Sequence, residues 1–167
     1  MFGGIGLDKK AIYELLDSLG IKYECTEHKA VYNMEEAAQI ALPHPEAEAK
    51  NLFVRDDKKK NYYLITVKGD KRVDLKKFRN ENDTRPLSFA SCAELESILK
   101  LSPGSVTPFG ALNDEEKRVK VFIDEDLIVS DLAGVHPNDN TATVWIKTSD
   151  LIRIIKQHGN EVYTFHV

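Results

Sequence analysis

Three short segments of the chain combine side chains that can do chemistry with residues that restrict the backbone. In the first segment, Lys50 and Asn51 precede two apolar residues, Leu52 and Phe53, at the start of a predicted strand. A cation and an amide held on such a rigid element can face a pocket. A lysine at a strand end can also extend along apolar surface into solvent, so both interpretations stay open.

The second segment is a loop bounded by a glycine and a proline. Its residues are Gly104, Ser105, Val106, Thr107 and Pro108. Main-chain N–H groups in a restricted loop can donate hydrogen bonds to a developing oxyanion or to a carbonyl oxygen. A loop that only connects a helix to a strand would have the same composition.

The third segment, residues 134–143, is the strongest candidate site of the three. It places a histidine, a carboxylate and two amides directly before a predicted buried strand. These side chains are His136, Asn138, Asp139 and Asn140. Such a density of polar groups at a strand entrance is typical of a binding or catalytic site, although Asn and Asp also favour turns for local reasons.

Several enzyme classes are excluded because their motifs are missing. The sequence has no G-x-S-x-G elbow, no Walker loop, no dinucleotide fingerprint and no H-E-x-x-H motif. The five histidines show no metal-ligand spacing with Cys25 and Cys92, so we expect neither a metal nor an organic cofactor. Two cysteines, no signal peptide and no apolar run of about 18 residues predict a cytoplasmic protein without a membrane partner.

The charge of the chain is unevenly distributed. The 167 residues carry a net charge of −4, but residues 50–79, which we call the basic segment, hold eleven basic and four acidic residues. This segment has a net charge of +7 and the rest of the chain −11. Such segregation favours a phosphate-bearing partner, and a solvated surface would give the same pattern.

The elements that position the three segments follow from hydrophobic periodicity and capping residues. Predicted helices cover residues 9–19 after Asp8, 33–40, 75–78, the stretch from Ser91 to a stop at Pro103 and Gly104, and a last helix that starts at Ser149 or Asp150 and ends at Gly159. Predicted strands cover residues 21–25, 52–55, 62–67, 119–123, 142–146 and 162–165. Helices and strands interleave without a βαβ rhythm, so the sequence predicts one α+β domain over residues 1–167.

Taken in order, the segments resemble the motifs of the editing domain inserted in bacterial prolyl-tRNA synthetases and of its free-standing, YbaK-type relatives. The resemblance covers nearly the whole chain. The series K-N-L-F, L-S-F, G-S-V-T-P-F and H-P-x-x-N-T-A-T is most similar to the deacylases that remove alanine mischarged onto proline tRNA. The family fold implies a mixed, partly barrel-like β-sheet wrapped by helices.

The resemblance implies hydrolysis of the ester between alanine and the 3′ adenosine of proline tRNA, with prolyl-tRNA synthetase as a further candidate partner. An aminoacyl ester is already activated, so a placed water, oxyanion stabilisation and a fitting pocket can suffice. Lys50 matches the key lysine of the family, and its ammonium would hold a phosphate or the developing negative charge. Asn51 would orient the substrate, and residues 104–108 would supply backbone donors. His136 would contact the amino acid or the ribose hydroxyl, and either His136 or that hydroxyl would assist the water.

A second pocket for alanine makes energetic sense, because a proline-sized site gains only about 1–3 kcal/mol of discrimination per missing methylene. We expect its walls among Val31, Phe53, Val67, Phe109 and the strand after Asn140, with Asn140 and Thr141 contacting the substrate. The expected contacts to the tRNA backbone are Lys58, Lys59, Lys60, Lys71 and Arg72.

Three other functions fit the same residues. One is a sister deacylase specific for cysteine or serine. Another is a non-catalytic module that binds aminoacyl-tRNA or docks on a synthetase. The third is a small-molecule binding domain without an RNA partner, for which binding would not depend on salt.

Overall fold

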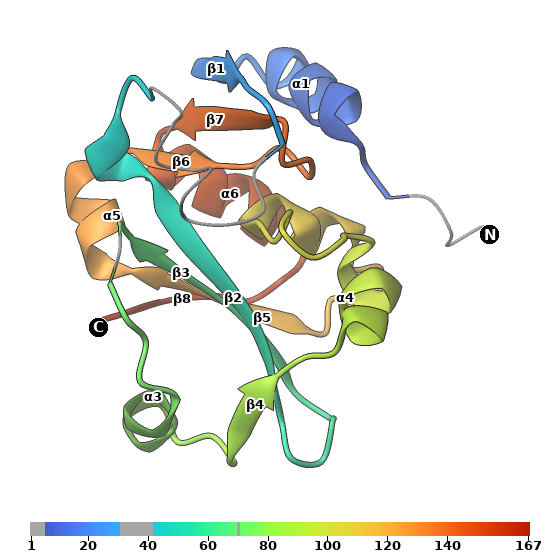
Figure 1. The fold of residues 1–167 in the computed structure, drawn as a ribbon, viewed down its shortest axis with the longest axis vertical. Helices are drawn as coiled ribbons and strands as arrows, with labels where there is room; N and C mark the ends of the chain where they lie inside the picture. Colours follow the sequence, from blue (N-terminus) through green and yellow to red (C-terminus); the bar gives the residue numbers. More distant parts are fainter. Residues whose placement is uncertain (1–5, 31–41, 70) are drawn as a thin grey trace.

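The computed structural model describes residues 6–30, 42–69 and 71–167, and Figure 1 shows their arrangement. Two of the sequence-based expectations lie outside these residues. They are the helix predicted from Asn33 to Ile40 and the pocket wall predicted at Val31.

Two open sheets form the framework. The five-stranded sheet has the order β4 (Leu87–Phe89), β2 (Ala49–Asp56), β3 (Tyr62–Lys68), β5 (Val119–Asp124), β8 (Val162–Phe165). The three-stranded sheet has the order β1 (Tyr23–Glu27), β7 (Ala142–Ile146), β6 (Ala133–Val135). The β3–β5 and β5–β8 pairs are parallel and the others antiparallel, which confirms the predicted mixed α+β class. Neither sheet closes on itself, so two open sheets replace the expected partly barrel-like sheet.

The strands β2 and β3 form the predicted hairpin, and Asp56 holds its turn. This buried carboxylate accepts hydrogen bonds from the Lys58 N–H at 3.1 Å, the Lys60 N–H at 2.9 Å and the Asn61 side chain at 2.8 Å. Because the turn is fixed from inside by Asp56, the side chains of residues 58–60 are left exposed at its tip.

Two of the capping residues read from the sequence begin their helices as predicted, whereas the last helix starts at Thr148 without a side-chain cap and not at Ser149 or Asp150. Asp8 accepts from the Ala11 N–H at the start of α1 (Lys9–Ser18), and Ser91 forms a capping box with Glu94 at the start of α4 (Cys92–Leu99). However, α4 ends at Leu99, where the C-cap Lys100 has φ +55°, and not at the predicted Pro103 and Gly104.

The last helix, α6 (Thr148–His158), ends at Gly159 as predicted, because φ +118° at that residue suits glycine. The helix predicted at residues 75–78 is longer in the structure and forms α3 (Leu75–Asn82). None of the helices in the described part of the chain is long and apolar enough to cross a membrane.

Several short elements were not predicted from the sequence. They are β4, β6, α5 (Glu125–Ser130) and the 3₁₀ helices η1 (Pro45–Ala47) and η2 (Pro108–Asn113). Each has six residues or fewer, which is too short for a hydrophobic period to be read.

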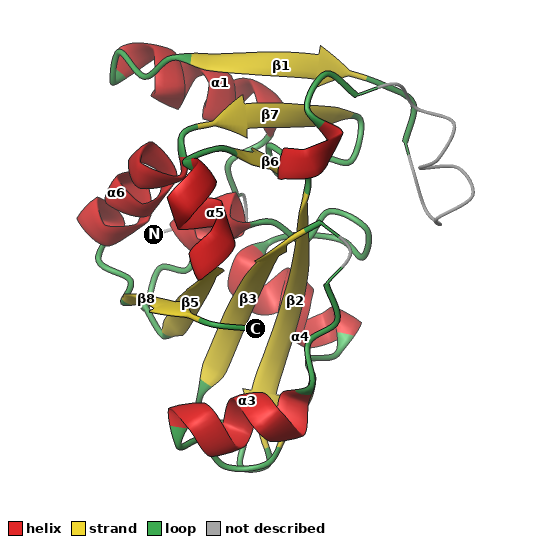
Figure 2. Ribbon diagram, turned by 90° about the vertical axis from the view of Figure 1, so that its left-hand side faces the viewer, coloured by secondary structure: helices red, strands yellow, loops and turns green. Residues whose placement is uncertain are grey.

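Two hydrophobic cores lie on opposite faces of the five-stranded sheet. The larger core includes Phe53, Leu64 and Val121 and is covered by α1, α4 and α6. In the smaller core, Phe78 of α3 packs edge-on against Phe122 with 4.9 Å between ring centroids. Figure 2 shows α3 at the far end of this sheet from the three-stranded sheet.

Glu94 ties α4 to the β2–β3 hairpin. Its carboxylate accepts from the Ser91 N–H at 2.9 Å, the Tyr62 hydroxyl at 2.5 Å and the Arg55 Nε at 3.2 Å. Burial opposes ionisation, but these hydrogen bonds outweigh it and lower the pKa of Glu94 to about 2. The ionised group therefore stabilises the packing of α4 on the sheet.

Candidate active site

A pocket of about 220 Å³ lies where the two sheets meet. The main chain joins them at this point through a parallel bridge between Glu48, just before β2, and Gly134 of β6. The pocket is lined by Glu48, Ala49, Asn51, Gly104, Val106, Gly134, Val135, His136 and Thr143. All three segments singled out from the sequence therefore contribute residues to one small cavity.

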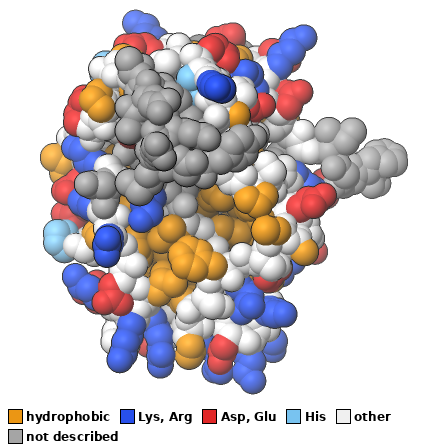
Figure 3. Space-filling model, in the orientation of Figure 1, with side chains coloured by type: hydrophobic (Ala, Val, Ile, Leu, Met, Phe, Trp, Pro, Cys, Tyr) orange, Lys and Arg blue, Asp and Glu red, His pale blue; other side chains and the backbone are white. Residues whose placement is uncertain are grey.

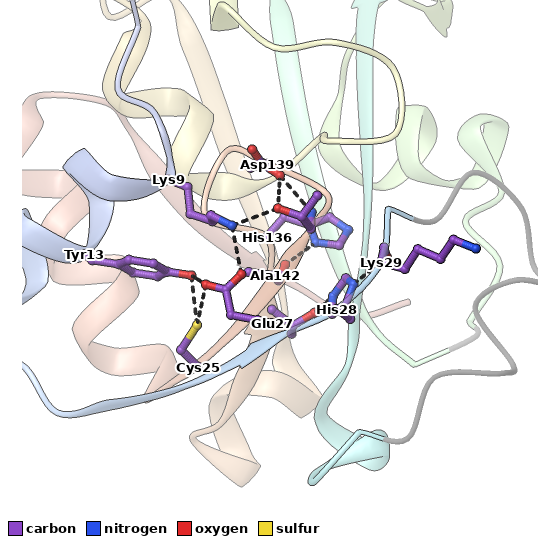
Figure 4. Close-up of polar contacts among 11 residues, drawn as sticks. Lys9, Tyr13, Cys25, Glu27, His28, Lys29, His136, Asp139 and Ala142 are labelled. Carbon is purple, nitrogen blue, oxygen red and sulfur yellow. Dashed lines mark hydrogen bonds and ion pairs between the residues drawn. The ribbon is translucent and has the colours of Figure 1, made fainter.

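His136 is held in one protonation state by its neighbours. Its Nδ1 lies 2.8 Å from the Ala142 carbonyl oxygen, as Figure 4 shows. A carbonyl only accepts, so Nδ1 carries the proton and Nε2 keeps a lone pair. Burial lowers the pKa of His136 despite the opposing hydrogen bond to Ala142, which keeps the ring neutral near pH 7. Nε2 is therefore a hydrogen-bond acceptor at the site.

The loop at residues 104–108 holds the main chain of the segment at residues 134–143. The Thr107 hydroxyl, which is fully buried, donates to the His136 carbonyl oxygen at 2.6 Å. The Thr107 hydroxyl oxygen in turn accepts from the Phe109 N–H at 3.4 Å at the start of η2. Thr107 thus positions His136 from behind and does not line the pocket.

A second histidine, His28, lies beside the first, with 6.2 Å between the ring centroids. Its Nδ1 is 2.9 Å from the Lys29 carbonyl and its Nε2 is 3.0 Å from the Thr143 hydroxyl. The carbonyl again requires a proton on Nδ1, and Nε2 shares a hydrogen bond with the Thr143 hydroxyl. His28 was not among the predicted site residues, although it lies in the stretch that carries the family resemblance.

Asn51 is oriented by the neighbouring strand. The buried Thr66 hydroxyl donates to Asn51 Oδ1 at 2.7 Å. With its oxygen engaged, Asn51 has its Nδ2 group left to donate, and this group has no partner among the described residues. A carbonyl oxygen in the pocket would find its donor here.

Lys50 does not line the pocket, in contrast to its neighbour Asn51. Successive residues of a strand point to opposite faces, and Lys50 pairs with Val67 on the face of the smaller core. The Lys50 side chain is exposed. The same alternation removes Val67 from the predicted pocket walls, because it is buried in the smaller core.

The other predicted contacts divide between the pocket and the protein interior. Gly104 and Val106 line the pocket. The Ser105 N–H donates to the Ser102 carbonyl at 3.1 Å, and Ser105 and Pro108 are buried outside the pocket lining. The whole loop was expected to supply backbone donors to the pocket. Only Gly104 and Val106 of this loop line the pocket.

The aromatic walls were placed wrongly by the sequence analysis. Phe53 stacks on Tyr62 with 5.6 Å between centroids, and Phe109 is fully buried; both belong to the larger core. In their place the pocket has Ala49, Gly134 and Val135 as walls, together with Glu48. Small apolar residues have no side-chain chemistry by which a sequence marks them as part of a site. Only knowledge of how the strands pair identifies them as pocket walls.

Asn140 and Thr141 lie next to the site without lining it. Asn140 is buried. The Thr141 hydroxyl accepts from Lys9 Nζ at 2.9 Å and donates to Asp139, and the same Lys9 pairs with Glu27 at 2.8 Å (Figure 4). The Lys9 hydrogen bond is the main cause that lowers the pKa of Glu27. This cluster ties α1 and β1 to the loop that carries His136.

No group of three His, Cys, Asp or Glu side chains suitable for a metal ion occurs in the described part of the chain. Cys25 is near the cluster described above, and its Sγ lies 2.8 Å from the Tyr13 hydroxyl. Burial raises the pKa of the Cys25 thiol.

The predicted tRNA contacts fall into two groups. Lys58, Lys59 and Lys60 are exposed at the hairpin tip, and Figure 3 shows Lys and Arg side chains gathered at this lower end of the molecule. Lys71 instead pairs with the buried Asp124 at 2.8 Å and with Asp126 at 2.6 Å, so its charge is neutralised locally.

Arg72 is exposed and lines a separate pocket of about 280 Å³ beside α3. The hairpin tip is also well separated from the active-site pocket. Asp56 is five residue steps along β2 from Asn51, roughly 17 Å along the strand.

The fold and the pocket define a small α+β domain with one compact cavity between two sheets, lined by a neutral histidine and an oriented amide. Residues 28–154 match the model of the aminoacyl-tRNA editing domain, and the chain belongs to this family. This membership confirms the resemblance read from the three segments and the expectation of an editing enzyme.

The relatives cover almost the full chain. It is 42% identical to the prolyl-tRNA editing protein ProX of Acetoanaerobium sticklandii, over 91% of this chain and 93% of that protein. It is 31% identical to prolyl-tRNA synthetase associated domain-containing protein 1 of Bos taurus, over 92% and 91% respectively. A solved structure named as a candidate trans-editing enzyme for prolyl-tRNA synthetase shares the fold, with a TM-score of 0.70, 21% identity and coverage of 98% and 99%.

Proposed function

We propose that residues 1–167 form one trans-editing deacylase domain, which hydrolyses the ester of alanine mischarged onto proline tRNA. The observation that carries this proposal is the convergence of Asn51, Gly104, Val106 and His136 on one pocket of about 220 Å³. Pockets for drug-sized ligands are roughly 300–1,000 Å³, so this one suits a small aminoacyl group. Family membership and the similarity to ProX support the same activity.

The polar groups of the pocket suit attack by water on an activated ester. His136 Nε2 accepts a hydrogen bond from the attacking water or from the ribose hydroxyl that assists it. Asn51 Nδ2 donates to the carbonyl oxygen on which negative charge develops. The water oxygen bonds to the carbonyl carbon and gives up a proton to the base, and the bond to the ribose oxygen breaks. The ribose oxygen takes up a proton to become a hydroxyl, and the amino acid leaves as the free acid, which loses its proton to solvent. The Thr143 hydroxyl lies 3.0 Å from His28 Nε2, and this hydrogen bond orients both side chains at the edge of the pocket.

Lys50 acts on this substrate from outside the pocket. It is one residue from Asn51 on a rigid strand, and its exposed ammonium is free to bind the phosphate of the terminal adenosine. In this role Lys50 does not contact the ester. A contact with the phosphate explains how Lys50 can be important for the reaction although it does not line the cavity.

The hairpin tip suits a more distant part of the same tRNA. The separation of roughly 17 Å from Asn51 to the start of the turn excludes contact between Lys58–Lys60 and the terminal nucleotide. These lysines instead bind the phosphate backbone of the acceptor stem. The proposed location of the protein is the cytoplasm, where tRNA is charged. Prolyl-tRNA synthetase, which releases the mischarged tRNA, is the proposed protein partner.

The direct test is release of amino acid from proline tRNA charged separately with alanine, proline, cysteine and serine. We expect the purified protein to release alanine faster than the other three. Faster release of cysteine or serine would assign the chain to a sister specificity. Binding of charged tRNA without release would indicate a non-catalytic module, and ligand binding that needs no tRNA and ignores salt would indicate a small-molecule domain.

A further inference from the structure

The pocket contains one charged residue for which the mechanism above has no use. Among the described residues that line the cavity, Glu48 is the one carboxylate, and none of the others is a lysine or an arginine. Glu48 lies two residues before the segment of Lys50 and Asn51, outside every motif singled out from the sequence.

The main chain of Glu48 is fixed at the mouth of the pocket. Its N–H donates to the Pro45 carbonyl at 3.3 Å, its carbonyl accepts from the Gly69 N–H at 2.7 Å, and it bridges to Gly134 of β6. The side chain is exposed and forms no ion pair with any described residue. Its charge also acts on the interior of the site, because it tends to raise the pKa of His136 against the larger effect of burial.

The substrate class supplies the missing counter-charge. An aminoacyl ester carries an α-amino group, and α-amino groups titrate near pH 7.7–8.0, so roughly four-fifths or more is protonated at pH 7. The other side-chain acceptors in the pocket are neutral. His136 Nε2 is unprotonated and keeps its lone pair, and Thr143 offers a hydroxyl oxygen. A carboxylate at the mouth is the group that pairs with an ammonium.

We propose that Glu48 binds the α-ammonium of the aminoacyl group and so makes the site selective for esters with a free amino group. This inference rests on the proposed deacylase function and assigns a substrate contact within the same pocket. With the ammonium at Glu48 and the carbonyl at Asn51 Nδ2, the two ends of the small substrate are oriented relative to the His136 acceptor.

The test compares Ala-tRNA(Pro) with N-acetyl-Ala-tRNA(Pro), whose amide carries no charge. Each rate is divided by the spontaneous hydrolysis rate of the same substrate. We expect the wild-type protein to favour the free amine by about tenfold, the order of one charge-assisted hydrogen bond. The preference should decline above pH 8, as the ammonium loses its proton.

Glu48→Gln should lower kcat/KM for Ala-tRNA(Pro) by about tenfold and leave N-acetyl-Ala-tRNA(Pro) nearly unchanged. Glu46→Gln is the matched control, because Glu46 is exposed on η1 two residues away and does not line the pocket. Circular dichroism of both variants checks that each is folded.

The possible outcomes separate the two proposals. If the wild-type protein hydrolyses neither substrate, the deacylase function fails and the Glu48 assignment fails with it. If the wild-type protein is active and Glu48→Gln keeps the tenfold preference, or loses activity equally on both substrates, the assignment of Glu48 is overturned and the deacylase function stands.

Discussion

Thr107→Val would test whether the loop at residues 104–108 positions His136. Valine has nearly the shape of threonine, so the substitution removes the hydroxyl and keeps the packing of a fully buried side chain. The hydroxyl donates to the His136 carbonyl at 2.6 Å and accepts from the Phe109 N–H at 3.4 Å. Both main-chain groups would lose this partner.

The expected effect on stability follows from the unsatisfied carbonyl. Leaving a buried acceptor without its donor costs about 1–3 kcal/mol, so we expect the free energy of unfolding to fall by about 2 kcal/mol. The weaker contact to Phe109 adds little at its length. For a chain of this size, about 2 kcal/mol corresponds to a decrease in Tm of roughly 4–8 °C.

The expected effect on activity is larger, because His136 shifts when its main chain is released. A displacement near 1 Å can cost about 100-fold in rate, so a decrease in kcat of at least about tenfold is expected at a temperature where the variant is folded. Urea unfolding gives the stability, and single-turnover release of alanine gives the rate.

Thr84→Val serves as the control. The Thr84 hydroxyl also donates to a main-chain carbonyl, that of Arg85 at 2.9 Å, but near the surface, where water can replace it. This variant should keep both stability and activity. Normal turnover in Thr107→Val, with lowered stability, would refute the positioning of His136 by Thr107. Unchanged stability would refute the claim that the Thr107 hydroxyl satisfies a buried carbonyl group.

Four further predictions follow from the geometry. Lys50→Ala should abolish deacylation without loss of stability, since Lys50 is exposed, and near-normal turnover would contradict its role. Burial lowers the pKa of His136, so the acid limb of the pH–rate profile should have its midpoint below pH 6.5; a midpoint above that value would contradict a neutral acceptor. Charge reversal of Lys59 and Lys60 should raise KM for tRNA and flatten its salt dependence, whereas an unchanged salt slope would mean a merely solvated tip. Glu94 has its pKa lowered from 4.5 to about 2, so up to about 3 kcal/mol of stability is present above pH 4.5 and is lost toward pH 2. Urea unfolding should show that the free energy of unfolding of Glu94→Gln decreases less between pH 4.5 and pH 2 than that of the wild-type protein. The same decrease in both proteins would mean that Glu94 is not the source of this pH dependence.

Elements with a strong local signal were predicted well. The strand at residues 142–146 has its predicted bounds, because five consecutive apolar or β-branched residues are flanked by turn residues. Ser91 and Glu94 specify the start of α4 through local hydrogen bonds. By contrast, β6 contains Gly134 and has three residues, so its strand character comes from pairing with β7 and cannot be read from its own sequence.

The same distinction applies to the site. The meeting of Asn51 and His136 at one pocket was predicted, because polar groups at strand entrances can be recognised by type. The position of Lys50 was not, since a strand sends adjacent side chains to opposite faces and the sequence alone does not say which face holds the pocket. Glu48 and Ala49 line the pocket because of the bridge to Gly134, a contact 86 residues away in the chain.

Gly134 limits how the pocket can change during evolution. A Cβ atom at this position would lie 2.2 Å from the Trp145 ring, which is buried and donates a hydrogen bond to Thr26. Every residue other than glycine has a Cβ, so any single mutation at this codon that changes the residue would displace the ring before it narrowed the cavity. New amino-acid specificities in this lineage are therefore expected to arise by mutation of Ala49, Val106 or other walls, while position 134 stays invariant.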